Sequence, residues 1–216
     1  MWVTGPLPSR YDLHQPPGSE PVSPARLRPL TPQEWSPQLS EALSAAYRPT
    51  EPKHPVPPRD PAAPKGLNAI GVLAHHPDVT IAFNHLITHA LYFATISVRQ
   101  RELLILRVAH LRDAQYEWAQ HVYQAGLVGI TADEMAQVRV GPDAEGWPPL
   151  ERALLSAADE LVSGARIQDG TYAVLSEELD AQQLMDVVFT VGAYEVFAMA
   201  MRTFDVELDG DLQRYA

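Results

Sequence analysis

Three residues in the stretch from 99 to 126 have side chains suited to proton transfer. Glu102 begins a long apolar run, and Glu117 and His121 lie in the polar and aromatic cluster that follows it. Because Glu117 and His121 are four positions apart, a helix would place them on one face, with Cβ atoms about 5–6 Å apart. A carboxylate beside an imidazole can exchange protons close to neutral pH. The stretch therefore predicts acid–base chemistry, and the alternative is an ordinary i,i+4 pair on a helix surface.

Other side chains near this stretch are candidates for binding. Arg107 lies among apolar neighbours, where an unpaired charge is costly, so it needs a carboxylate of this protein or of a ligand. Tyr116 and Trp118 suit a pocket wall or the core. His85 and His89 have the i,i+4 spacing of a metal pair, but no acid flanks them in an H-E-x-x-H arrangement. We expect no metal site and treat both histidines as candidate cavity-lining residues.

Two helices would bring these groups together. Residues 102–111 are apolar almost all round, which indicates a helix buried on most sides. An acid at the N-terminal end of such a helix, Glu102, is also favoured by the helix dipole alone. Residues 114–121 are compatible with a second helix, and an antiparallel arrangement would return His121 to Glu102.

The remainder of the chain from residue 66 onward also has helical periodicity. Apolar residues recur at helical spacing, strand-like alternation is absent, and we expect an all-α domain of about seven to nine helices over 66–216. Thr131 and Glu134 have the spacing of a capping box at the start of one of these helices. No glycine pattern of a dinucleotide or phosphate loop occurs, so we expect no nucleotide cofactor.

Residues 1–65 differ in composition because they hold most of the 20 prolines. Repeated proline removes backbone donors and fixes φ, so we interpret this segment as an extended, proline-rich N-terminal arm with one short helix at about 37–48. Simple disorder is the alternative. Aromatic side chains such as Trp35 favour contact of parts of the arm with the helical domain or with a neighbouring subunit.

Composition restricts the possible functions. A formal net charge of −11 argues against nucleic acid as a partner, and the absence of cysteine excludes disulfides, thiolate metal sites and thiol redox chemistry. The first residues have neither the basic start nor the apolar core of a secretory signal, and we find no apolar run long enough to span a bilayer. We therefore expect a cytoplasmic protein without a membrane partner.

Residues 101–127 resemble the signature segment of the carboxymuconolactone decarboxylase family, whose superfamily also contains the AhpD-type alkylhydroperoxidases. The Arg-Glu-Leu element at 101–103 and the Tyr-Glu-Trp-x-x-His element at 116–121 carry the resemblance, which extends over about residues 30–210. It implies an AhpD-like helical bundle that assembles as a homo-oligomer, a trimer or a hexamer.

The resemblance also assigns roles. In the peroxidase branch a Cys-x-x-Cys precedes the histidine, but here those positions hold Ala114 and Glu117. The chain is therefore similar to the decarboxylase-like branch, which implies cofactor-free decarboxylation or isomerisation of a small anionic lactone or ring compound, as in aromatic compound catabolism. In that reading Glu117 and His121 are the proton-transfer pair, Glu102 orients or tunes His121, and Arg107 is a candidate anion contact.

Two alternatives stay open. The chain could descend from the peroxidase branch and lack thiol activity, or it could be a non-catalytic oligomeric binding protein that keeps the fold. A closed pocket that contains the acids and the histidine, with a basic residue opposite, would favour a lyase-like enzyme. Side chains scattered over the surface would favour the binding protein.

Overall fold

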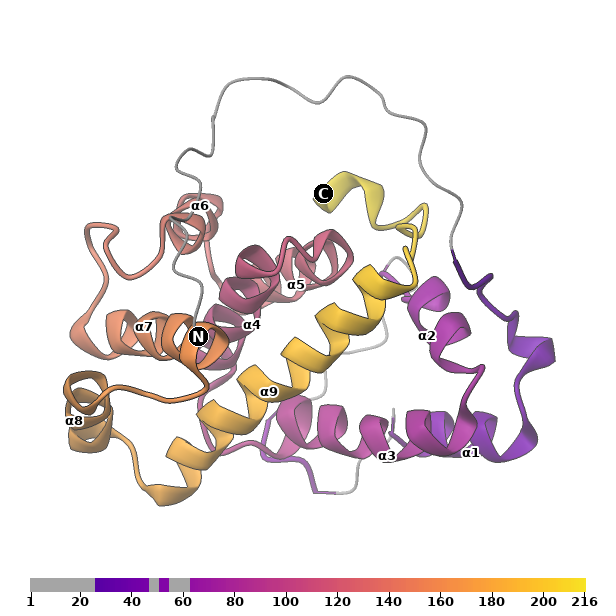
Figure 1. The fold of residues 1–216 in the computed structure, drawn as a ribbon, viewed down its shortest axis with the longest axis horizontal. Coiled ribbons are helices and arrows are strands. Elements are labelled where there is room, and N and C mark those ends of the chain that lie inside the picture. The colour runs from indigo at the N-terminus through magenta and orange to yellow at the C-terminus, as the bar shows by residue number, and fades with distance from the viewer. Residues whose placement is uncertain (1–25, 47–50, 55–62) are drawn as a thin grey trace, which may run out of the picture.

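A computed structural model of the chain describes residues 26–46, 51–54 and 63–216. Within these residues the protein is all-helical, with nine α-helices and no strand (Figure 1). The predicted fold class is confirmed. In chain order the α-helices are α1 (Pro37–Ala46), α2 (Leu67–Leu73), α3 (Pro77–Thr88), α4 (Val98–Leu111), α5 (Gln115–Leu127), α6 (Ala132–Val140), α7 (Pro149–Gly164), α8 (Asp169–Glu178) and α9 (Ala181–Thr203).

Helix α4 lies at the centre of the molecule. It packs against α5, α7 and α9, and every side chain from 101 to 109 is buried. The apolar members of this run, among them Leu104 and Ile105, pack with Leu154 of α7 and Val191 of α9. The sequence predicted this burial, because a helix that is apolar on all sides must be surrounded.

Capping residues set where several helices begin. Ser97 caps α4 in a reciprocal box with Gln100, and the Thr131–Glu134 box predicted from the sequence starts α6. Each box satisfies backbone N–H groups that the first helical turn leaves without partners. The three residues between α4 and α5 include Asp113, whose φ is +49°, and they reverse the chain so that α5 packs on α4.

The helix predicted to follow Pro77 changes its winding before it ends. After α3, residues His89–Phe93 form a π-helical turn, closed by a bond of 2.8 Å from the Ala94 N–H to the His89 carbonyl. Asp186 of α9 holds the end of this turn: one of its carboxylate oxygens lies 2.8 Å from His89 Nε2, and the other accepts from the Thr95 hydroxyl at 2.6 Å. Turns of this kind are frequent at functional sites.

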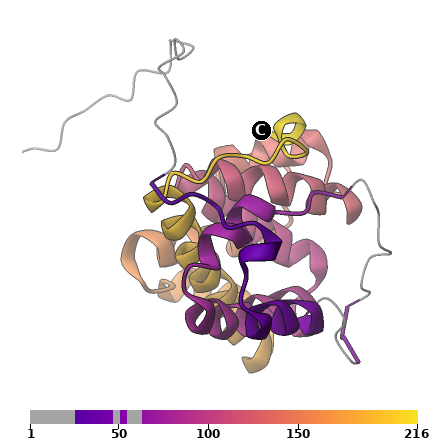
Figure 2. The same ribbon diagram turned by 90° about the vertical axis from the view of Figure 1, so that its right-hand side faces the viewer.

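The described part of the predicted arm is attached to the helical domain. The 3₁₀ turn Pro32–Glu34 and α1 lie beside α2 and α3 (Figure 2), and Leu39 and Leu43 are buried in a cluster with Ala74. The Leu30 N–H also donates to the Gly71 carbonyl at 2.9 Å. The helix expected at about 37–48 is thus α1, whereas the stretches 1–25, 47–50 and 55–62 of the expected arm lie outside the described residues.

Helix α9 is the one described helix long and apolar enough to cross a membrane by length and composition. Its buried side, which includes Val187, Val191 and Tyr194, contributes to the central core of the domain. The helix therefore serves as a core element here, and it also presents Tyr194 to the candidate site.

Candidate functional site

The contact that links α4 to α5 joins Glu102 and His121. His121 Nδ1 lies 2.7 Å from Glu102 Oε2, and both side chains are buried. The sequence predicted that two packed helices would return His121 to Glu102, and the geometry agrees. Because a ring nitrogen bonded to a carboxylate is held in place, this contact fixes the orientation of the imidazole.

Glu102 has a second partner that we did not single out from the sequence. The neighbouring Arg101 donates through Nε to Glu102 Oε1 at 2.9 Å, and its Nη1 donates to the Leu91 carbonyl of the π-helical turn at 2.6 Å. Burial alone would raise the pKa of Glu102, but His121 and Arg101 outweigh it and lower the pKa. Glu102 is therefore an ionised carboxylate in the interior.

The second acid, Glu117, is in the opposite situation. It is 0% exposed, and neither of its carboxyl oxygens has a hydrogen-bond partner among the described residues. Burial raises its pKa well above the ordinary value, and the nearby Glu195 raises it further. Glu195 itself is paired with Arg112 at 2.7 Å. This shift favours the neutral form of Glu117, and the partner of His121 is Glu102 rather than Glu117.

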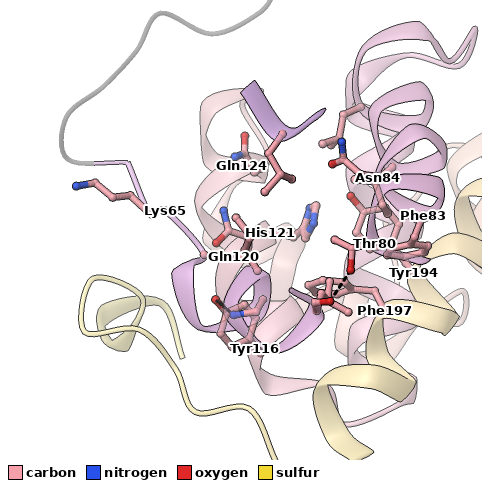
Figure 3. Close-up of a pocket in the computed structure, with 17 residues that line it drawn as sticks. Lys65, Thr80, Phe83, Asn84, Tyr116, Gln120, His121, Gln124, Tyr194 and Phe197 are labelled. Atoms are coloured by element: carbon pink, nitrogen blue, oxygen red, sulfur yellow. Dashed lines mark hydrogen bonds between the residues drawn. The ribbon is translucent and has the colours of Figure 1, made fainter. Parts of the chain in front are cut away.

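His121 forms part of the wall of a cavity of about 180 Å³ (Figure 3). With Nδ1 bonded to Glu102, Nε2 is the nitrogen left to meet a bound molecule. The Tyr194 ring and the imidazole pack edge to face, with centroids 4.9 Å apart. Most of the cavity wall is apolar, contributed by Leu43, Ala69, Ile70, Leu73, Phe83, Ile87, Leu91 and Phe197.

Polar groups in this cavity come from α3 and α5. Asn84 of α3 and Gln120 of α5 lie on opposite sides of it in Figure 3. Asn84 Nδ2 and Gln120 Oε1 are both shielded from solvent and have no hydrogen-bond partner among the described residues. Sequence reasoning missed Asn84 and Tyr194. A lone amide within an apolar helix was the available signal for Asn84, and Tyr194 gave no signal because an aromatic in an apolar helix is ordinary core.

The structure does not place Arg107 at the cavity. Its guanidinium donates to Asp159 at 2.6 and 2.9 Å and to the Val138 and Arg139 carbonyls at 2.9 Å. It also lies against Gly141, whose φ is +98° and where a Cβ would come within 2.5 Å of Nη2. The expectation that Arg107 contacts a substrate anion is therefore corrected: its partner is a carboxylate of this protein.

The other predicted binding residues divide between cavity, core and surface. Tyr116 lines the cavity, and its hydroxyl donates to Asp209 at 2.5 Å. Trp118 is buried away from the cavity, beneath the Arg139 guanidinium at 4.1 Å. His85 and His89 are exposed and do not line it. Among the residues that the structure describes, no group of three or more potential ligands could hold a metal ion.

Comparison with known proteins agrees with this fold. Residues 77–160 match the sequence model of the carboxymuconolactone decarboxylase family. A peroxidase-related protein with an alkylhydroperoxidase AhpD core, from Ralstonia eutropha JMP134, superposes with a TM-score of 0.69 at 15% identity, covering 90% of this chain and 96% of that one. A search of the curated proteins finds no significant match.

Two further solved structures have the same fold. The debrominase Bmp8 superposes with a TM-score of 0.67 at 13% identity, covering 87% of this chain and 94% of its own. A putative antioxidant defence protein AhpD from Agrobacterium tumefaciens superposes with a TM-score of 0.59 at 17% identity, covering 62% of this chain and 93% of its own. At these identities the likeness establishes the AhpD-like helical fold.

Proposed function

For a chain that carries a carboxymuconolactone decarboxylase family segment in an AhpD-like fold, we propose an enzyme that uses His121 for cofactor-free proton transfer on a small ring compound. One observation supports this most directly: an ionised Glu102 lies 2.7 Å from Nδ1 of an imidazole that lines an apolar cavity. A histidine fixed by a carboxylate on one nitrogen can take up and return a proton at the other.

The proton path follows from the tautomer that Glu102 selects. When Nδ1–H donates to Glu102, Nε2 carries a lone pair and removes a proton from an acidic C–H, N–H or O–H group of the bound ring. The resulting imidazolium is stabilised by Glu102 and returns the proton to another position, which completes an isomerisation. In a decarboxylation, CO₂ leaves, its bonding electrons form an enolate, and a protonated His121 delivers the proton to the carbon.

Glu117 is not part of this path. It does not line the cavity and has no hydrogen bond to His121. The proton-transfer pair expected from the sequence, Glu117 with His121, is therefore replaced in our proposal by Glu102 with His121. Tyr194, whose ring packs on the imidazole, restricts its rotation and is a positioning residue.

The structural neighbours support a small ring as the substrate class. A variant of the debrominase Bmp8 has been solved with 2,3,4-tribromopyrrole, a single heteroaromatic ring. The alternative of descent from the peroxidase branch remains compatible with the fold, but this chain has no cysteine for thiol chemistry. A binding protein without catalysis is the other alternative, and the test below separates it from an enzyme.

Solvent exchange tests the proposal on simple ring compounds in place of the natural substrate. The protein is incubated in D₂O with small lactones and cyclic ketones, with and without a carboxylate, and NMR follows both deuterium uptake and CO₂ loss. We expect exchange that falls by about 100-fold or more in His121→Asn, the typical share of general acid–base catalysis. His85→Asn, an exposed histidine away from the cavity, is the matched control. Equal rates in wild type and His121→Asn would refute the proposal.

We also propose that the protein forms a homo-oligomer through α9. Met185, Val188, Phe189, Val196 and Met199 recur at helical spacing along this helix and are 41–59% exposed. A row of large apolar side chains is costly to leave in water, and a second copy of the chain would cover it. Phe189→Asp should lower the mass measured by light scattering after gel filtration, whereas Val140→Asp should not, although Val140 of α6 is even more exposed, at 65%. An unchanged mass for Phe189→Asp would exclude this interface.

A further inference from the structure

We infer that the cavity beside His121 binds an uncharged single ring that carries one hydrogen-bond acceptor for Asn84 and one donor for Gln120. This inference rests on the proposed function for the identity of the site. It adds the class of ligand to that function, and it is argued from Asn84 and Gln120, which take no part in the proton transfer.

The size and walls of the cavity suit a single ring. Its volume is about 180 Å³ and its walls are mostly aliphatic and aromatic. An apolar cavity of about 150 Å³ is enough to bind benzene. One six-membered ring with small substituents therefore fits.

Two unpartnered polar atoms select the substituents. Within the described part of the chain, Asn84 Nδ2 is a donor without an acceptor and Gln120 Oε1 is an acceptor without a donor, although both are shielded from water. Leaving such groups unpaired is unfavourable, so a ligand that supplies the missing partners gains affinity. The two side chains come from α3 and α5 and lie on opposite sides of the cavity (Figure 3), so the ligand's acceptor and donor occupy separate positions on the ring.

The charges around the cavity favour a neutral ligand. Among the residues that the structure describes, no arginine lines it: Arg101 is bonded to Glu102 and the Leu91 carbonyl, and Arg107 to Asp159. Lys65 is the lining residue with a full positive charge, and its ammonium group is turned outward in Figure 3. The negative charges nearby repel an anion: the ionised Glu102 is bonded to His121, and the whole chain has a net charge of −11. A carboxylate would lose its water here without gaining a cation, so of the two reactions proposed above an uncharged ligand favours isomerisation over decarboxylation.

A matched set of phenols tests each part of the inference. At pH 6.5, para-hydroxyacetophenone is uncharged and has one donor and one acceptor. Para-hydroxybenzoate has the same shape with a carboxylate, para-cresol lacks the acceptor, and acetophenone lacks the donor. In calorimetric titration of the full-length protein, para-hydroxyacetophenone should bind at least tenfold more tightly than para-hydroxybenzoate.

Variants then assign the polar contacts. Asn84→Leu should lower the affinity for para-hydroxyacetophenone about tenfold and leave the affinity for para-cresol unchanged. Gln120→Leu should lower the affinity for para-hydroxyacetophenone to a similar extent and leave the affinity for acetophenone unchanged. Gln124→Leu is the control, because Gln124 lines the same cavity but has no buried unpartnered atom. Neither Asn84→Leu nor Gln120→Leu should lower the melting temperature, because each removes an unsatisfied group.

The outcomes separate the inference from the proposed function. If para-hydroxybenzoate bound more tightly than para-hydroxyacetophenone, the proposed ligand class would be wrong. It would also be wrong if Asn84→Leu lowered the affinities for para-cresol and para-hydroxyacetophenone equally. Equilibrium binding needs no turnover, so intact selectivity without deuterium exchange would refute the catalytic role of His121 and leave the ligand class standing.

Discussion

Glu102 and Glu117 lie on neighbouring helices, and both are 0% exposed, yet their pKa values are shifted in opposite directions. Glu102 is bonded to His121 and Arg101, which lower its pKa despite burial, whereas Glu117 has no hydrogen-bond partner and burial raises its pKa. Burial therefore does not decide the charge of a carboxyl group in this protein. The partners placed around it do.

The difference has a functional meaning. The ionised Glu102 can hold and stabilise a histidine that exchanges protons with a ligand. Glu117 lies close to the paired Glu195 and has no hydrogen-bond partner of its own among the described residues. The acid with the more obvious i,i+4 spacing to His121 is thus the less active of the two in our proposal.

Removal of Glu102 should have the largest effect. Glu102→Ala leaves Arg101 and His121 buried without their carboxylate, and we expect the free energy of unfolding to fall by about 3–5 kcal/mol. Urea denaturation at pH 7 measures this change. Glu102→Gln keeps a hydrogen-bond acceptor and should lose less. A loss below about 1 kcal/mol for Glu102→Ala would mean that the partners around Glu102 contribute little.

Replacement of Glu117 should have the opposite sign. Glu117→Met removes an unsatisfied group from the interior, so we expect the free energy of unfolding at pH 8 to rise by about 1–2 kcal/mol. Urea denaturation of both proteins in the same buffer gives the difference. Destabilisation by Glu117→Met would show that the carboxyl group makes a contact that stabilises the fold.

The pH dependence of stability sharpens the contrast. The pKa of Glu117 is raised by burial and by Glu195, so the folded protein keeps a proton that the unfolded chain releases above about pH 4.5. Its contribution to stability is therefore present below that pH and declines as pH rises toward the folded pKa. The pKa of Glu102 is lowered, so its contribution is present above about pH 4.5 and is lost as pH falls.

Glu117→Gln and Glu102→Gln make these two contributions measurable. Urea denaturation from pH 3 to pH 9 should show that the free energy of unfolding declines less with rising pH in Glu117→Gln than in wild type. The free energy of unfolding that Glu102→Gln loses relative to wild type should become smaller as the pH falls. Parallel pH profiles for wild type and both variants would contradict the assigned charge states.

Asp159→Asn should have the smallest effect of the substitutions considered. Asp159 is partly exposed, and an amide keeps one acceptor for Arg107, so we expect a loss of about 1 kcal/mol in the free energy of unfolding. Affinity for a ring in the cavity should stay within twofold of wild type. A selective loss of ligand binding would return Arg107 to the site.

The sequence predicted the secondary structure and the central helix of this molecule well. The all-helical fold, the buried helix headed by Glu102 and the Thr131–Glu134 cap follow from periodicity and capping chemistry, which are local properties of the chain. The return of His121 to Glu102 was also predicted, because two helices joined by a short turn have few ways to pack.

Long-range partners were harder to predict. The Arg107 contact depends on how α7 packs against α4, and the cavity depends on α3, α5 and α9 meeting at one place. The partners of Glu102 and Glu117 depend on the same packing, and no single-sequence pattern distinguishes a paired buried acid from an unpaired one. Asn84 and Tyr194 were missed for this reason.

The π-helical turn at His89–Phe93 has an evolutionary consequence. Such a turn contains one residue more than an α-helical turn, so deletion of a single residue there would restore regular winding and rotate the following carbonyls by about 100°. The Leu91 carbonyl would then leave the Arg101 guanidinium, and the support behind Glu102 would be lost. Insertions and deletions in this turn, more than substitutions, should distinguish relatives that share this chemistry from those that have diverged.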